Sequence, residues 1–216
     1  ISNVMLPLMA EKKDSQNALK SVLRKAMQLS AYLVFPMMGI LAACARPLVL
    51  VLLGQKWAEC VPYLQVACLF YLFQPLQSMN WQALKAAGQG ALCFKLEVIK
   101  KAISFIVLIM SIPFGVFAIS LSSAFCGFVS MLINMTPNKK VLGYGIFEQL
   151  IDVLKPSIAT LFSVVIALLL IHISNGNLIS LIVAPLGSLG CYIVLSKLMN
   201  IEGFKLLMEK LSLRRN

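Results

Sequence analysis

Long runs without a single charged side chain alternate along the chain with short charged stretches. Residues 26–45 form an uncharged run of 20 residues, and residues 60–84 form one of 25. The run 102–138 has 37 residues, and the run 156–196 has 41. About 20 apolar residues cross a membrane as one helix, because each residue adds about 1.5 Å. The first two runs therefore predict one membrane-spanning helix each, and the two longer runs predict two each.

Each of the longer runs contains a turn signal. Residues 113–115 (Pro-Phe-Gly) predict a turn in the first of them, and residues 175–177 (Asn-Gly-Asn) predict one in the second. The third span must then begin before residue 102, inside a charged stretch. We expect Lys95, Lys100 and Lys101 to reach the interface by snorkelling. The prediction is an all-α, polytopic transmembrane bundle of about six spans.

The cations test this count. Lys and Arg number five before the first expected span, then two, four, none, three, none and five in the successive connections and the tail, which accounts for all 19. Cytoplasmic loops carry an excess of Lys and Arg. The alternation therefore places both ends of this chain on the cytoplasmic side of a cell inner (plasma) membrane. Because the cations flank apolar runs, the net charge of +11 is interpreted as a membrane signature and not as a nucleic-acid-binding surface.

The same patterns divide the chain into segments. Residues 1–10 resemble the end of a helix that began earlier, so we expect a longer protein. Residues 14–25 and 204–213 place apolar and basic side chains on opposite helix faces, as in helices that lie on a membrane surface. The expected segments are a preceding helix end and amphipathic segment (1–25), spans one to four (26–135), a cytoplasmic loop (136–156), spans five and six (157–197) and an amphipathic tail (198–216).

Composition agrees with a membrane protein and gives no sign of catalysis. Hydrophobic residues make up 60% of the chain and charged residues only 12%, against about 25% charged in an average soluble domain. The six cysteines lie mostly in apolar runs, where cysteine behaves as a small hydrophobe, and His172 has no carboxylate near it in sequence. We predict no metal, no cofactor and no enzymatic activity.

One polar stripe on the second expected span is a candidate functional site. Gln74, Gln77, Ser78, Trp81 and Lys85 fall within an arc of about 100° on a helix. Polar side chains in a membrane face the bundle interior or a wet cavity. An indole stacks on a sugar face, amides bond hydroxyls and a lysine attracts phosphate, so the stripe suits a sugar or headgroup passage. The alternative interpretation is hydrogen bonding between helices.

Two further features have a structural and a functional interpretation. Arg46 follows the first span, where it is either a site for an anionic group at the outer leaflet or an interfacial anchor. The fourth span carries a stripe of small and polar residues, which favours close helix packing over a lining role. That stripe consists of Ser120, Ser123, Gly127, Ser130 and Asn134.

The order of motifs resembles the C-terminal half of a polysaccharide flippase of the Wzx type, in the multidrug/oligosaccharidyl-lipid/polysaccharide exporter superfamily. The most specific part is the A-x-P-x-x-x-x-L-L-G-x-x-W string of residues 45–57. It is flanked by looser matches at residues 6–8 with Asp14, at Pro36, and at Asn80 with residues 84–89. Such flippases have about twice as many spans, so the resemblance implies that a first half is missing.

The resemblance implies a fold and a function. The fold is a MATE-like C-terminal lobe with extra helices, and the function is moving a lipid-linked oligosaccharide on an undecaprenyl-diphosphate carrier across the inner membrane. The implied partners are that substrate, membrane lipids and polysaccharide polymerase or export machinery. Two alternatives stay open: a drug/cation antiporter of the MATE family, which expects acidic residues in the span cores, and a non-transport membrane scaffold of polysaccharide export.

Overall fold

The computed structural model describes residues 9, 15–174 and 178–213. In these residues the chain forms helices joined by short turns, with no strand. The 3₁₀ turns are η1 (Gln55–Cys60) and η2 (Ile112–Phe114). The α-helices are α2 (Gln16–Ala43), α3 (Ala45–Leu52), α4 (Val61–Ala86), α5 (Gly90–Ser111), α6 (Val116–Met135), α7 (Asn138–Leu142), α8 (Ile146–Ile173), α9 (Leu178–Leu198) and α10 (Glu202–Leu213). The predicted all-α helical bundle is confirmed.

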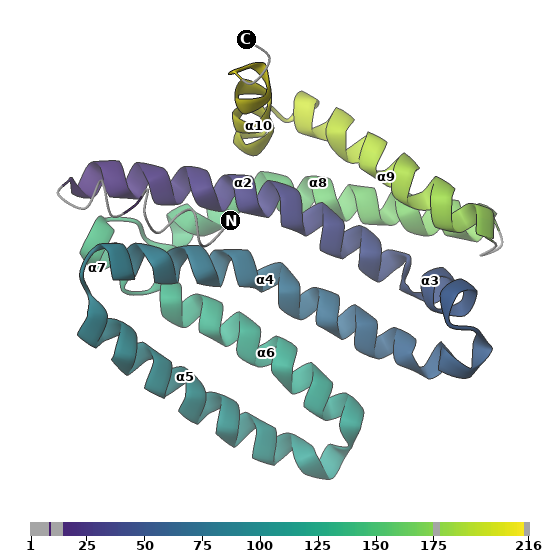
Figure 1. Ribbon diagram of the computed structural model, residues 1–216, viewed down its shortest axis with the longest axis horizontal. Coiled ribbons are helices and arrows are strands. Elements are labelled where there is room, and N and C mark those ends of the chain that lie inside the picture. Colours follow the sequence, from purple (N-terminus) through teal and green to yellow (C-terminus); the bar gives the residue numbers. More distant parts are fainter. Residues whose placement is uncertain (1–8, 10–14, 175–177, 214–216) are drawn as a thin grey trace.

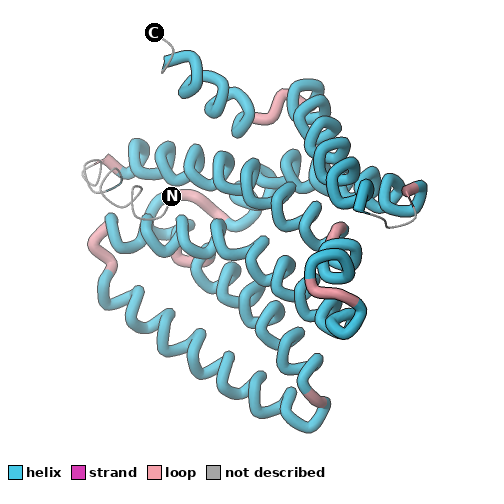
Figure 2. The backbone as a smooth tube through the Cα atoms, turned by 45° about the vertical axis from the view of Figure 1, so that its right-hand side comes forward, coloured by secondary structure: helices cyan, strands magenta, loops and turns pink. Residues whose placement is uncertain are grey.

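The long helices lie side by side in the spatial order α5, α6, α4, α2, α8 and α9 (Figures 1 and 2). Each long helix crosses the bundle in the direction opposite to the long helix before it in the chain (Figure 1). α2 lies at the centre, between α4 and α8. Half of its apolar stretch is buried, against about a quarter in α6, α8 and α9. α2 therefore packs against both α4 and α8 and joins the two halves of the bundle.

The outer surface of the bundle is that of a multi-pass membrane protein. Large apolar side chains point outward, among them Phe105, Leu161 and Leu186, each 65% exposed. Apolar surface of this extent marks contact with lipid or protein. Four helical stretches of the described residues are long and apolar enough to cross a membrane: Gln16–Ala43, Val116–Leu142, Ile146–Ile173 and Ser180–Leu198. α4 contains several glutamines and α5 begins with charged residues, so their crossing stays a prediction.

The turn expected at residues 113–115 is confirmed. α5 ends at Ser111, the 3₁₀ turn η2 follows, and α6 begins at Val116. Gly115 has φ 88°, a left-handed conformation that glycine adopts without steric cost. The turn expected at residues 175–177 lies outside the described residues.

The two charged segments expected outside the spans are largely helical. α2 begins at Gln16, after Ser15, whose Oγ accepts a hydrogen bond from the Ala18 amide at 3.4 Å. The expected amphipathic segment 14–25 is therefore not a separate element: residues 16–25 continue into the first span, and Leu19 and Leu23 are buried in the core. α8 likewise begins ten residues before the uncharged run 156–196. Ion pairs join the first turns of α2 to those of α8, and they are described below.

One end of the bundle gathers most of the basic residues. The start of α2, the α4–α5 turn, α7 and the start of α8 lie together at the left of Figure 1, while α3 lies at the opposite end. Lys20, Lys85 and Lys139 belong to these segments. We call this the basic end; that it faces the cytoplasm stays a prediction.

The tail forms α10, which packs on the central helix. A Cβ added to Gly203 would lie 2.5 Å from Cβ of Tyr32, so only glycine permits this approach. The ring of Phe204 lies 6.3 Å from the ring of Tyr32. The start of the tail is therefore held by the bundle; a location on the membrane surface stays a prediction.

Candidate functional site

The polar stripe of α4 faces a cavity that α5 and α6 complete. The cavity has a volume of about 350 Å³, and we call it the polar hollow. It is lined by Gln74, Gln77, Ser78, Trp81, Glu97, Lys100 and Asn134. Ser104 and Ser130 line a smaller continuation of about 170 Å³, which again borders Gln74 and Gln77. Four of the six residues predicted from sequence thus share one cavity.

Two ammonium groups lie near the indole ring of Trp81. Nζ of Lys100 is 4.4 Å from the centre of the indole, and Nζ of Lys85 is 5.4 Å from it. Ammonium groups within about 6 Å of an aromatic face are attracted by its quadrupole. Lys85 is exposed in the last turn of α4. Lys85 therefore lies at the exposed edge of the polar hollow, next to Trp81.

Lys100 is inside the bundle, so the expectation that it snorkels to the interface is wrong. Only 8% of the residue is exposed, and its Nζ lies 2.8 Å from Oε2 of Glu97, one helical turn earlier. The buried face of α5 runs through Cys93, Leu96 and Lys100. This i, i+3, i+7 spacing is the sequence signal that separates Lys100 from Lys95 and Lys101, both of which are exposed.

Arg46 is not part of the polar hollow. It is exposed in the first turn of α3, at the end of the bundle opposite the basic end (Figure 1). About 39 residues of chain and the length of α4 separate it from Lys85, and α4 alone extends about 39 Å. The structure therefore brings Gln74, Gln77, Ser78, Trp81 and Lys85 together and leaves Arg46 apart.

The stripe also borders a second cavity. Gln74 and Ser78, with Pro75 between them in sequence, line a space of about 430 Å³ between α4 and α2. Tyr71 and Val34 complete its more apolar wall. The polar face of α4 thus borders two cavities.

Asparagines make hydrogen bonds between α4 and α6–α7. Nδ2 of Asn138 donates to Oδ1 of Asn80 at 2.5 Å, and Nδ2 of Asn134 donates to the Gln77 carbonyl at 3.3 Å. All three asparagines are at most 1% exposed. Asparagine side chains and the backbone of Gln77 therefore make hydrogen bonds between these helices.

The small-residue stripe of α6 has both roles. A Cβ added to Gly127 would lie 2.8 Å from Cδ2 of Phe70 on α4, so the predicted close packing is confirmed at this position. Ser130 and Asn134, one and two turns further on, line the polar hollow and its continuation. Gly127 packs against α4 and also borders the continuation of the polar hollow, and Ser130 and Asn134 extend this lining toward the basic end.

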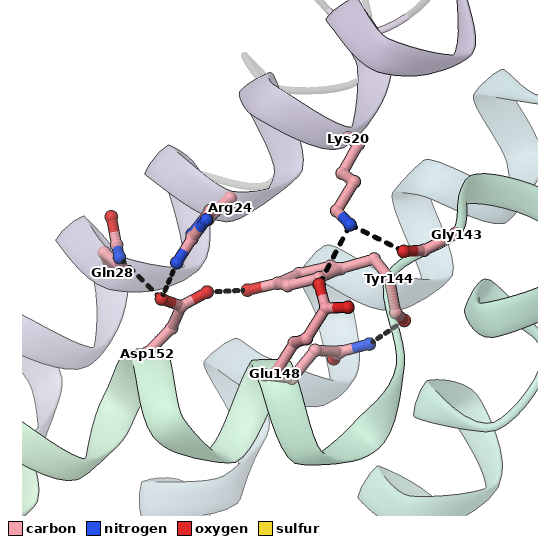
Figure 3. Close-up of polar contacts among 8 residues, drawn as sticks. Lys20, Arg24, Gln28, Gly143, Tyr144, Glu148 and Asp152 are labelled. Carbon is pink, nitrogen blue, oxygen red and sulfur yellow. Dashed lines mark hydrogen bonds and ion pairs between the residues drawn. The ribbon is translucent and has the colours of Figure 1, made fainter.

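A second polar cluster joins α2 to α8 (Figure 3). Nη2 of Arg24 donates to Oδ1 of Asp152 at 2.6 Å, and Nε2 of Gln28 donates to the same oxygen at 3.1 Å. The Tyr144 hydroxyl donates to Oδ2 at 2.6 Å. The Asp152 side chain is only 5% exposed, so three donors replace the water it has lost.

Lys20 extends this cluster by one helical turn. Its Nζ donates to the Gly143 carbonyl at 2.6 Å and lies 2.9 Å from Oε2 of Glu148. Burial raises the pKa of the Tyr144 phenol, and its hydrogen bond to the Asp152 carboxylate raises it further. The phenol thus remains a donor at neutral pH. We call Lys20, Arg24, Gln28, Tyr144, Glu148 and Asp152 the α2–α8 network.

Sequence reasoning missed the α2–α8 network because Arg24 and Asp152 are 128 residues apart. A helical spacing reveals neighbours on one helix but not partners on another. Among the described residues, no three His, Cys, Asp or Glu side chains gather as a metal site would require.

Comparison with known proteins reaches only the start of the chain. Residues 1–62 match a family model described as "Polysaccharide biosynthesis protein". The start of the chain thus resembles polysaccharide biosynthesis proteins. The match includes α2, α3 and η1, and with them the string of residues 45–57, but not the polar hollow. No curated protein and no solved structure matches the chain significantly. The match and the apolar helices together fit a polysaccharide-related membrane protein.

Proposed function

We propose that the chain is the C-terminal half of a membrane flippase that moves lipid-linked oligosaccharide, of the undecaprenyl-diphosphate type, across the inner membrane. The family match at residues 1–62 supports a role in polysaccharide biosynthesis. The multi-pass bundle supports an action within the membrane. The flippase role itself rests on the resemblance of the motifs and on the chemistry of the polar hollow.

The observation that carries the proposal is that Trp81, in a cavity lined by glutamines, has the ammonium groups of Lys85 and Lys100 near its ring. A lipid-linked oligosaccharide combines sugar faces, hydroxyls and a diphosphate. Indole offers stacking surface, amides both donate and accept hydrogen bonds, and ammonium groups attract phosphate. All three functions are present in the polar hollow.

The proposal places the basic end in the cytoplasm, because Lys and Arg are concentrated in cytoplasmic loops. A cysteine replacing the exposed Lys139, in a variant without the six native cysteines, should react with a membrane-impermeant thiol reagent only after the cells are opened. Reaction in intact spheroplasts would reverse the orientation.

Transport is tested by the surface glycan of a flippase-deficient strain, normalised to the amount of membrane-inserted protein. In the full-length protein, Lys85→Glu should lose most of the flux and Lys85→Arg should keep much of it, because long-range attraction to a diphosphate needs charge more than shape. Trp81→Ala should lower flux, and Trp81→Phe should restore part of it. Lys139→Glu is the matched control, since this exposed lysine lies at the same end but outside the polar hollow.

Two results would count against the proposal. Normal flux per molecule in both Lys85→Glu and Trp81→Ala would remove the polar hollow from the passage. Failure of the unmodified full-length gene to restore surface glycan would exclude the flippase function itself, and the scaffold and antiporter alternatives would then take its place.

A further inference from the structure

The second cavity, between α2 and α4, differs from the polar hollow in its charge. Its volume is about 430 Å³, and its lining includes Ser30, Val34 and Met38 of α2 and Gln74 and Met79 of α4. We call it the α2–α4 cavity. None of the described residues that line it is charged. An ion would lose its hydration there without gaining a partner of opposite charge, so the lining favours an uncharged ligand.

The hydroxyl of Ser30 is a buried polar group with nothing to bond. Ser30 is 1% exposed, and among the described residues its Oγ has no hydrogen-bond partner. Buried side-chain polar atoms are normally paired, because an unpaired one has lost its water without compensation. Ser30 also lines the α2–α4 cavity. Its hydroxyl is therefore a group that an occupant of this cavity can satisfy.

The wall that continues from Ser30 along α2 is apolar. Ser30, Val34 and Met38 recur at every fourth position, so they share one face of α2 over about 12 Å. Met79 of α4 adds to the apolar surface. Methionine side chains are flexible and adapt to different apolar partners. One hydroxyl followed by an apolar track matches an aliphatic chain that carries a hydroxyl at its end.

We propose that the α2–α4 cavity binds an uncharged amphiphile of the aliphatic-alcohol class. The ligand hydroxyl pairs with Oγ of Ser30, and the chain lies along Val34 and Met38. A ligand dissolved in the membrane can reach the cavity, because the lining residue Tyr71 is 54% exposed. The inference goes beyond the proposed function and does not depend on it, since it concerns a second ligand that carries neither sugar nor phosphate.

Two other occupants fit the α2–α4 cavity less well. Ordered water needs several polar partners for each molecule, and beyond Ser30 the α2 side of the cavity offers only Val34 and Met38. A ligand with a phosphate group finds a cation in the polar hollow, at Lys100, but none in the lining described here. An uncharged chain with a hydroxyl meets neither difficulty.

An occupant of this cavity lies across the points at which both helices can bend. Pro36 falls between Val34 and Met38 in α2, and Pro75 of α4 lines the cavity itself. Proline removes a hydrogen bond from the helix and permits a kink. A bound alcohol is therefore expected to hold α2 and α4 in one relative arrangement. Its role is that of an effector of the bundle.

Binding is measured by photolabelling the purified full-length protein in lipid nanodiscs with 3-azioctanol, a photoreactive analogue of octanol. Labelled residues are identified by mass spectrometry. We expect label on Tyr71, and we expect excess 1-octanol to suppress it. Octanoate has the same chain length with an anionic head. It should not compete, because the described lining offers no cation to replace the water that a carboxylate loses.

The hydroxyl is tested by Ser30→Ala. The concentration of 1-octanol that halves the labelling of Tyr71 should rise about fivefold, as expected for the loss of one hydrogen bond. Ser21→Ala is the matched control, because Ser21 is an exposed serine of the same helix outside the cavity. It should leave this concentration unchanged.

The chain is tested by filling the cavity with a larger side chain. Val34→Trp should abolish the labelling of Tyr71 that 1-octanol suppresses. Met37→Trp introduces the same side chain at a neighbouring position that is 59% exposed and does not line the cavity. This control variant should retain the labelling.

Three results would overturn the inference. Labelling of Tyr71 that 1-octanol does not suppress would show contact with bulk lipid only. Competition by octanoate as strong as that by 1-octanol would exclude an uncharged ligand class. Unchanged competition in Ser30→Ala would remove the hydroxyl from the site. None of these measurements depends on surface glycan, so a failure of the flippase function would leave them unaffected.

Discussion

The α2–α8 network and the polar hollow use the same kinds of side chain in opposite ways. In the network the carboxylate is buried: the side chain of Asp152 is 5% exposed, and its partner Arg24 is 51% exposed. In the polar hollow the cation is buried, with the Lys100 side chain 9% exposed and that of Glu97 45% exposed. Asp152 has three donors from three residues, whereas Lys100 has one exposed carboxylate. The first arrangement joins two helices, and the second pairs a buried ammonium with a carboxylate on its own helix.

We expect the largest effect on stability from a substitution in the α2–α8 network. Asp152→Ala removes the acceptor of Arg24, Gln28 and the buried Tyr144 hydroxyl. Leaving such donors unpaired should lower the free energy of unfolding by about 2–3 kcal/mol. The measurement is the thermal unfolding midpoint of the protein in dodecyl maltoside.

Glu148→Ala is the matched control for Asp152→Ala. Glu148 belongs to the same network, but its side chain is 52% exposed, and exposed ion pairs contribute about 0–1 kcal/mol. Its midpoint should therefore lie close to that of the unmodified protein. Equal losses in the two variants would show that burial of Asp152 is not what makes the network stabilising.

A smaller effect is expected from Tyr144→Phe, which removes one of the three donors. The loss should be about 1 kcal/mol. Because the folded-state pKa of Tyr144 is raised above its ordinary value of about 10, the stabilisation is fully present below that value and is lost only as pH rises through the folded-state pKa. The difference in unfolding midpoint between Tyr144→Phe and the unmodified protein should thus be the same at pH 7 and pH 9. A difference that shrinks over this range would mean that the phenol ionises earlier.

The smallest effect on stability is expected in the polar hollow. Lys100→Gln removes a costly buried charge and leaves Glu97 with access to water, so the free energy of unfolding should change by less than about 0.5 kcal/mol. A large loss of stability in Lys100→Gln would show that Lys100 stabilises the fold, as Asp152 does. The two clusters would then not differ in their roles.

The sequence was sufficient where structure depends on local chemistry. The uncharged runs predicted the helical bundle, and the Pro-Phe-Gly turn of residues 113–115 was correct because a left-handed glycine ends one helix and begins the next. The stripe on α4 was predicted because residues at helical spacing share a face whatever surrounds them. Four of its members do line one cavity.

The sequence was insufficient where structure depends on partners far along the chain. Residues 14–25 were interpreted as an amphipathic segment on the membrane surface, but residues 16–25 are the first turns of α2. There Lys20 and Arg24 pair with Glu148 and Asp152 of α8. Lys100 was placed at the interface because a lysine in isolation avoids a buried site; Glu97 and Trp81 make burial acceptable. Arg46 was a separate candidate for a passage residue, expected after the first span, and no spacing along one helix relates it to α4.

α2 is a single helix of 28 residues, with the network at one end and α3 at the other. At about 1.5 Å per residue it is a rod of about 42 Å. A tilt of about 5° about the Arg24–Asp152 contact displaces Ala43, about 29 Å further along the helix, by roughly 2.5 Å. Pro36 interrupts the hydrogen-bond ladder between those ends and is the point at which the helix can flex. Small rotations at the basic end are thereby magnified at the end that carries Arg46.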